Sequence, residues 1–156
     1  MDRRCLLLLL VFSGCTYSFN PSLYSHIRSI AIPVFENETV KYGLAEPFTN
    51  KLIEAFMEDG SLSIQSEKEA DSILNGKIVK YEKLPLIYDE YERVSSLKVV
   101  IRIEAQFVDR VRDRILWTRE FEDWGRYAAD EDEEKGIEET IEKLKNRIVG
   151  EIIEAW

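Results

Sequence analysis

The stretch LKVVIRIEAQFVD, residues 97–109, decides the fold class of this chain. From Leu97 to Phe107, apolar side chains occupy every second position, and most of the positions between them hold charged or polar side chains. A period of two over a segment of this length is typical of a β-strand with one buried face and one solvated face. The sequence therefore predicts a long strand here, at the heart of a sheet.

Two further strands are expected beside this one. Residues 72–83 are strand-like, and Gly76 among them indicates a bulge or the close approach of another segment. Residues 115–124 follow the tight turn 109–114 and are expected to pair back onto the central strand. Because Arg119 has the same parity as the apolar residues of 115–124, this strand is predicted to be bulged or only partly buried.

The first half of the chain contributes shorter segments. Residues 27–35 (IRSIAIPVF) predict a strand, and Pro33 within it has no N–H to donate to a neighbour. This strand is therefore expected at a sheet edge, or bulged at the proline. Residues 36–43 are predicted to form a loop, and residues 62–65 a short strand.

Two segments predict amphipathic helices. Residues 46–60 begin with Glu46-Pro47, where a proline in the first turn costs no hydrogen bond, and they end at Gly60, which suits a left-handed cap. Residues 130–156 carry apolar side chains at spacings of three and four. The expected apolar stripes are Phe48, Leu52, Ile53, Phe56 and Met57 in the first helix, and Ile137, Ile141, Leu144, Ile148, Val149, Ile152, Ile153 and Trp156 in the second.

Together these elements predict an α+β fold. A sheet with one apolar face and two helices with one apolar stripe each bury those surfaces best against one another. We expect a two-layer sandwich: a mainly antiparallel sheet of about four to five strands, with the two amphipathic helices packed on one face. No internal repeat or low-complexity linker interrupts residues 27–156, which are predicted to form a single domain.

The N-terminal segment MDRRCLLLLLVFSGC, residues 1–15, has the pattern of a lipoprotein signal. Its apolar run, residues 5–12, is far shorter than the roughly 20 residues that span a bilayer and has the size of a signal-peptide core. Small residues then precede Cys15, whose thiol is the nucleophile that bacterial lipoproteins acylate. The prediction is a signal peptide over 1–14 and a lipidated tether over 15–26; the alternative is an ordinary secretory signal with a free thiol.

Lipidation at Cys15 has consequences for the mature chain. Cys5 is removed with the signal peptide and Cys15 is blocked, so no disulfide is expected. By resemblance to other bacterial lipoproteins, Thr16 after the cysteine favours the outer membrane. The formal net charge of −9 becomes −10 when Asp2, Arg3 and Arg4 are removed.

Charge and composition exclude several functions. A strongly acidic chain argues against nucleic acid as a partner, because phosphate binding needs clustered Lys and Arg. The sequence has no phosphate loop, no nucleophile elbow and no His or Cys cluster with metal-ligand spacing. His26, the single histidine, is expected to be partly buried and structural. We therefore predict no catalytic residue, no metal, no cofactor and no enzyme activity.

Two basic features and two aromatic residues are the candidate functional residues. Guanidinium groups suit phosphate oxygens, so the basic features are interpreted as a contact for phosphorylated lipid headgroups; the alternative is solubility and protection of a sheet edge or hairpin tip. Trp124 and Tyr127, predicted to lie beyond the last strand, are candidate partner-interface anchors. The basic candidates are Arg110, Arg112 and Arg114 in the turn, and Lys77 and Lys80 along the 72–83 strand.

Four longer stretches resemble the lipopolysaccharide-assembly lipoprotein family (LptE-like). They are HIRSIAIPVFENET (26–39), LAEPFTNKLIEAFMEDGSLSI (44–64), EADSILNGKIVKYEKLPLIYD (69–89) and ILWTREF (115–121). The resemblance extends over nearly all of the chain after Cys15, although the family usually has Gly directly after the lipidated cysteine, where this chain has Thr16. The order and spacing of these stretches, more than any one of them, define the likeness.

The resemblance implies a non-catalytic, lipid-anchored subunit of the cell outer membrane, with its domain on the periplasmic side or within a barrel lumen. Such a protein acts as plug and assembly partner of an LptD-type β-barrel and helps deliver lipopolysaccharide, a ligand, to the outer leaflet. The opening of the sequence also resembles outer-membrane lipoproteins that regulate peptidoglycan synthases or form a curli-type secretion component, which stays the alternative.

Overall fold

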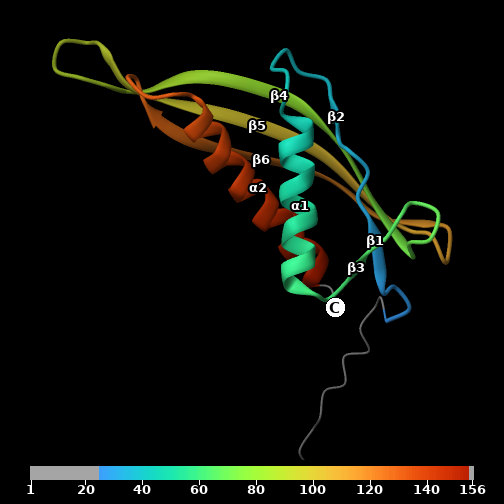
Figure 1. The fold of residues 1–156 in the computed structure, drawn as a ribbon. Helices are drawn as coiled ribbons and strands as arrows, with labels where there is room; N and C mark the ends of the chain where they lie inside the picture. Colours follow the sequence, from blue (N-terminus) through green and yellow to red (C-terminus); the bar gives the residue numbers. More distant parts are fainter. Residues whose placement is uncertain (1–24, 155–156) are drawn as a thin grey trace, which may run out of the picture.

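Three long antiparallel strands form the main part of the sheet in the computed structural model, which describes residues 25–154 (Figure 1). They are β4 (Ser72–Tyr88), β5 (Val94–Asp109) and β6 (Arg114–Ala128), joined by two hairpins. The predicted signal peptide, Cys15 and Trp156 lie outside the described residues.

Three short strands complete a mixed sheet. Strand β1 (Ser29–Ala31) pairs in parallel with β4 on one side and with β3 (Ser63–Ile64) on the other. Strand β2 (Glu36–Asn37) also pairs in parallel with β4. The order is β3-β1-β4-β5-β6, with β2 beside β4. Because the parallel pairs are only two residues long, the sheet is mainly antiparallel, as predicted.

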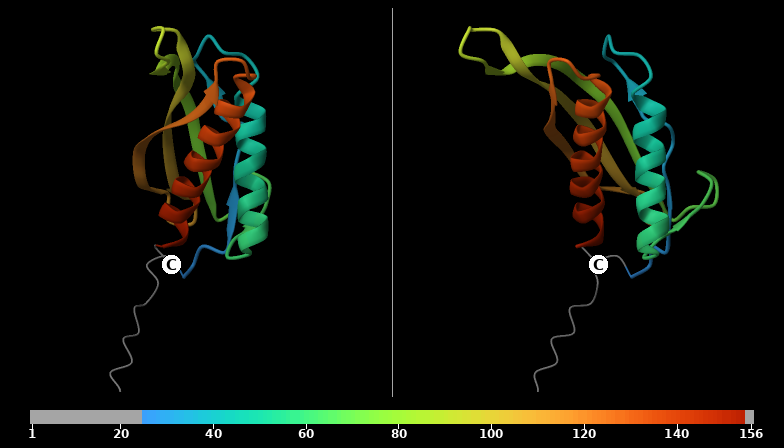
Figure 2. Two further views of the ribbon diagram at one scale, coloured as in Figure 1. Left: turned by 90° about the vertical axis from the view of Figure 1, so that its left-hand side faces the viewer. Right: turned by 60° about the vertical axis from the view of Figure 1, so that its left-hand side comes forward.

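Both helices, α1 (Ala45–Asp59) and α2 (Glu134–Ile153), lie on the same face of the sheet, which curves over them (Figures 1 and 2). The α+β two-layer architecture is thus confirmed. Most of the apolar stripes face the core, but Met57 is 67% exposed and does not belong to the α1 stripe. The core comprises Phe48, Leu52 and Phe56 from α1, Ile137, Leu144, Ile148 and Ile152 from α2, and Leu74, Ile78, Val99, Ile101, Ile103 and Phe107 from the sheet.

The predicted strand 27–35 is divided in two by Pro33. The ladder runs only over β1, and the chain rejoins the sheet at β2, inside the segment expected to be a loop. The expectation of an edge strand is wrong, because β3 covers the other side of β1. The proline instead lies in the gap between β1 and β2, where its missing N–H leaves no ladder bond unmade.

Gly76 allows the segment after Pro33 to pack tightly on the sheet. A Cβ atom at this position would lie 2.0 Å from Cε1 of Phe35, so only glycine leaves room for the phenyl ring. The predicted close approach is confirmed. The bulge of β4 lies further on, between Ile78 and Lys80.

Strand β6 extends beyond the predicted 115–124, and this corrects the placement of Tyr127. Its ring lies in the core, 6% exposed, because Tyr127 pairs with Leu97 on the inner face of the sheet. Close packing of α2 is possible there because Gly125 has no side chain; a Cβ would lie 2.2 Å from the carbonyl oxygen of Gly136. Arg119 is exposed at the sheet margin and pairs with Glu151 of α2, so this strand is partly buried, as predicted.

Candidate functional surfaces

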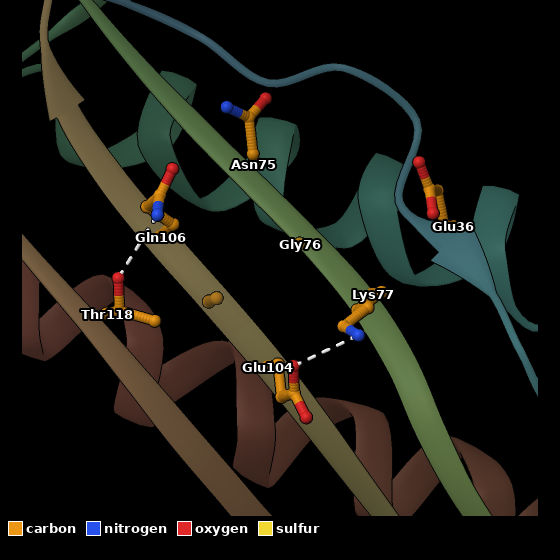
Figure 3. A pocket seen from close by; sticks show the side chains of 8 residues that line it. Glu36, Asn75, Gly76, Lys77, Glu104, Gln106 and Thr118 are labelled. Carbon is orange, nitrogen blue, oxygen red and sulfur yellow. Dashed lines mark hydrogen bonds and ion pairs between the residues drawn. The ribbon is translucent and has the colours of Figure 1, made fainter. Parts of the chain in front are cut away.

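The open face of the sheet carries a shallow polar depression (Figure 3). Small residues and short polar side chains make this hollow on β4, β5 and β6, opposite the helices. Nε2 of Gln106 donates a hydrogen bond to Oγ1 of Thr118 at 3.2 Å, and Nζ of Lys77 lies 3.2 Å from a carboxylate oxygen of Glu104. The lining residues are Glu36, Asn75, Gly76, Lys77, Glu104, Ala105, Gln106 and Thr118.

The two lysines predicted to bind lipid phosphate are held by carboxylates on this face. Hydrogen bonds to the carboxylates of Glu104 and Glu38 raise the pKa of Lys77. The two carboxylates also compensate the charge of its ammonium group. The ammonium group of Lys80 lies 3.1 Å from Glu82 and 3.6 Å from Glu122. The structure therefore makes both lysines part of an ion-pair network across the strands, because register places acidic side chains next to them.

The same network includes Arg102, which lies directly opposite Glu122 on β6. Its guanidinium Nη2 is 2.8 Å from the Glu122 carboxylate. Hydrogen bonding to Arg102 lowers the pKa of Glu122 and keeps it ionised. The charges in this central part of the open face are thus paired with one another.

The hairpin between β5 and β6, residues 110–114, is called here the arginine turn. Two hydrogen bonds hold its backbone in place. The N–H of Arg110 donates to the carbonyl of Asp71 at 2.8 Å, and the N–H of Arg112 donates to the carboxylate oxygen Oδ1 of Asp109 at 3.0 Å. The guanidinium of Arg114 lies 3.4 Å from Oδ2 of Asp109. Within residues 25–154, the exposed side chains of Arg110 and Arg112 have no ion-pair partner.

Asp109, which precedes the arginine turn and holds it in place, is a residue that the sequence analysis did not single out. Its side chain is fully buried, and its Oδ2 accepts a hydrogen bond from Nε2 of His26 at 2.7 Å. His26 is thus structural and partly buried, as predicted, with 18% of its side chain exposed. The alternation of β5 could have predicted the burial of Asp109, because Asp109 follows the same odd-numbered positions as the inward-facing apolar residues.

Trp124 is the exposed member of the two predicted interface aromatics. It lies on the open face of the sheet, 41% exposed, beside the ammonium groups of Lys143 and Lys98. These lie 4.8 and 5.7 Å from the ring centroid, and Lys143 also donates to the Trp124 carbonyl at 2.7 Å. Tyr127 is buried in the core and has no surface to offer a partner.

The β4–β5 hairpin is a feature that sequence reasoning missed. It projects beyond the helices at the end of the sheet opposite the arginine turn (Figure 1). Apolar side chains on it are exposed, among them Tyr88 at 59% and Tyr91 at 70%. The segment LPLIYDEY after Lys83 could have predicted this hairpin, because its apolar residues continue from the strand into the turn.

Neither a metal centre nor a membrane span is found in the part of the chain that the structure describes. Among residues 25–154, no group of three or more His, Cys, Asp or Glu side chains could hold a metal ion. No helix in the same range is long and apolar enough to cross a bilayer.

Solved structures with this fold include bacterial lipoproteins. The chain is similar to protein XCC0632 from Xanthomonas campestris (TM-score 0.60, 12% identity, 81% of this chain and 84% of that one). It is similar to the hypothetical protein CT253 from Chlamydia trachomatis (TM-score 0.59, 9% identity, 81% and 95%). A third is the rare lipoprotein B from Shewanella oneidensis (TM-score 0.50, 12% identity, 80% and 94%). No curated protein sequence matches the chain.

Fold and surface together define a class of protein: a small two-layer α+β domain with two helices on one face of the sheet and ion pairs on the open face. The model of the lipopolysaccharide-assembly family LptE matches residues 27–154. The chain therefore belongs to the LptE lipopolysaccharide-assembly family.

Proposed function

We propose that this protein is an outer-membrane lipoprotein, acylated at Cys15, that acts as plug and assembly partner of an LptD-type β-barrel. In this role it assists lipopolysaccharide delivery to the outer leaflet and performs no catalysis itself. The observation that carries the proposal is the family match over residues 27–154, which covers both helices and every strand of the described chain.

The open face of the sheet supports the plug role. The interior of an outer-membrane barrel is polar and hydrated. An ion-paired face such as that of Lys77, Glu104, Arg102 and Glu122 suits such a wall, because it is soluble yet has few unpaired charges to desolvate. Trp124 on this face is the proposed aromatic contact with the barrel.

The arginine turn is the proposed contact for lipid phosphate. Arg110 and Arg112 are exposed and lack ion-pair partners within residues 25–154, whereas Lys77 and Lys80 are held by carboxylates. A planar guanidinium group can give two parallel hydrogen bonds to phosphate oxygens. The proposal therefore assigns lipid phosphate to the turn and not to the lysines of β4.

Purification from the native host tests the partnership. Membranes are solubilised in mild detergent, the protein is isolated through a C-terminal tag, and copurifying proteins are identified by mass spectrometry. A stoichiometric large outer-membrane β-barrel is the expected result. A peptidoglycan synthase, or a homo-oligomer without a barrel, would overturn the translocon role in favour of the alternative named above.

A matched Cys15→Ala variant tests the anchor in the same preparation. The substitution lies outside the residues that the structure describes and removes the acylated thiol. We expect the variant to move from the membrane fraction toward the soluble fraction, and to remain in membranes only to the extent that the barrel retains it. Unchanged fractionation in cells that lack the barrel would contradict the anchor.

A further inference from the structure

We propose that the arginine turn docks on the anionic phospholipid headgroups of the leaflet that holds the acyl anchor. The inference rests on the lipid anchor of the proposed function. It deepens that function by naming the phosphate-bearing lipid that the turn meets: the surrounding membrane, and not the transported lipopolysaccharide.

Hydrogen bonds hold the first described residues beside the arginine turn. Nε2 of His26 bonds to Asp109, the residue that precedes the turn, at 2.7 Å. N–H of Arg28 donates to Oδ2 of Asp71 at 2.8 Å, and the carbonyl of Asp71 accepts N–H of Arg110 at 2.8 Å. These contacts hold the chain that arrives from Cys15 at the same end of the sheet as the arginine turn (Figure 1).

The length of the intervening chain limits how far this end can lie from the membrane. Ten residues lead from Cys15 to Ser25 and span at most about 35 Å when fully extended. The opposite end of the sheet is far less accessible to the leaflet, because the sixteen residues of β5 extend for about 50 Å along the strand. An anchor at Cys15 therefore limits the arginine turn to the neighbourhood of the headgroups, whereas the β4–β5 hairpin can lie much further from them.

The chemistry of the turn fits an anionic surface. Arg110 and Arg112 are exposed and unpaired within residues 25–154, and they flank Val111, which is 58% exposed. Ile115, just after the turn, is also 58% exposed. Exposed apolar side chains set between arginines are typical of segments that lie at the membrane interface, where the guanidinium groups bind phosphate and the apolar groups enter the headgroup region.

The carboxylates near the arginine turn mostly accept hydrogen bonds from other groups of the protein. The Asp109 carboxylate is buried and accepts hydrogen bonds from His26 and from N–H of Arg112. The Asp71 carboxylate accepts N–H of Arg28. Asp113 is the exposed acid within residues 110–114, against three arginines, so this stretch is positive in a chain whose formal net charge is −9.

A fluorescent label in the turn tests the contact on the anchored protein. The lipidated chain carrying Val111→Cys is labelled with an environment-sensitive maleimide dye and reconstituted into phosphatidylcholine vesicles with or without phosphatidylglycerol. The dye is expected to brighten, and to be quenched by spin-labelled lipid, only when phosphatidylglycerol is present. Tyr91→Cys in the far hairpin is the matched control, and its dye is expected to report water in both vesicles.

Charge variants connect this contact to the arginines. Each arginine at an anionic surface contributes about a fivefold change in binding, so Arg110→Gln with Arg112→Gln should lower the docked-to-undocked ratio about 25-fold. Lys98→Gln with Arg126→Gln removes the same charge from two facing residues nearer the other end of β5 and should leave the ratio unchanged. Equal loss in both double variants would overturn the assignment to the turn.

Other outcomes separate the docking from the anchor. A dye at position 111 that stays in water on vesicles with phosphatidylglycerol, but responds when lipopolysaccharide is added, would overturn the proposal in favour of the transported lipid. A response that is identical in the two vesicle types would also overturn it. Dye uptake by the mature chain without an introduced cysteine would reveal a free Cys15 thiol, which contradicts the anchor itself.

Discussion

His26 and Asp109 are 83 residues apart in the chain, and Nε2 of the histidine lies 2.7 Å from Oδ2 of the aspartate. The Asp109 carboxylate is fully buried and also accepts the N–H of Arg112. Burial acts to raise the pKa of Asp109, but the hydrogen bonds from His26 and Arg112 outweigh it, so the pKa lies below its ordinary value. This contact joins the entry of the chain into the fold to the end of the central strand.

The first prediction concerns the pH dependence of this contact. Since the folded-state pKa is lowered, the ionised Asp109 stabilises the fold above its unfolded-state pKa of about 3.9, and that stabilisation is lost as the pH falls through the folded-state pKa. We expect Asp109→Asn to cost about 1–3 kcal/mol near neutral pH, and the difference from wild type to shrink below about pH 4. Thermal unfolding across this range measures it; a difference that does not change with pH would contradict the ionic role.

A second prediction tests the close approach at Gly76. Gly76→Ala would place a Cβ atom 2.0 Å from the Phe35 ring, and the resulting displacement is expected to cost about 1–3 kcal/mol. Gly150→Ala is the matched control, because nothing lies within 4 Å of a Cβ at that helical position. It should stabilise the protein by about 0.5–1 kcal/mol. Equal melting temperatures for the two variants would show that Phe35 does not pack against the strand.

A third prediction concerns the free edge of β6, which side chains of α2 cover. Arg147 donates to the carbonyl of Glu122 at 2.6 Å, Lys143 donates to that of Trp124 at 2.7 Å, and Glu139 accepts N–H of Arg126 at 2.9 Å. Uncovered strand edges pair with other chains. Lys143→Ala with Arg147→Ala should therefore accelerate aggregation while costing less than about 2 kcal/mol of stability.

Light scattering during heating measures the rate of aggregation of the double variant. Lys145→Ala is the control, since Lys145 of the same helix pairs with Glu142 and, within residues 25–154, makes no hydrogen bond or ion pair to the edge of β6. Aggregation at the same rate in the control and in the double variant would show that helix charge, and not coverage of the edge, governs solubility.

A fourth prediction uses the buried hydroxyl of Tyr81. Burial raises the pKa of Tyr81 to about 12, the nearby Glu133 carboxylate adds to this shift, and the hydroxyl makes no hydrogen bond of good geometry within residues 25–154. Because an unsatisfied buried hydroxyl costs about 1–3 kcal/mol, Tyr81→Phe should melt at or above the temperature of wild type. A clear decrease in the free energy of unfolding would mean that the hydroxyl is hydrogen-bonded in solution.

Much of the fold could be predicted because it depends on local periodicity. The alternation over residues 97–109 placed β5 to within three residues, and Gly60 ended α1 with φ of 73°, as its lack of a Cβ allows. The placement of Tyr127 beyond β6 was wrong, and of the two alternatives for residues 27–35 the edge position was excluded by β3, because both questions depend on which segments pair. Pairing between distant segments leaves no pattern within either segment alone.

The candidate functional residues show the same division. Sequence by itself determined that arginines crowd one turn and that lysines lie along β4, since both follow from order along the chain. Only the tertiary structure decided that Glu104 and Glu122 form ion pairs with those lysines. It also decided that Arg110 and Arg112 stay unpaired within residues 25–154 and that their turn lies beside His26. The reason is physical: a charge is available or neutralised according to its neighbours in space, and strand register and packing choose those neighbours.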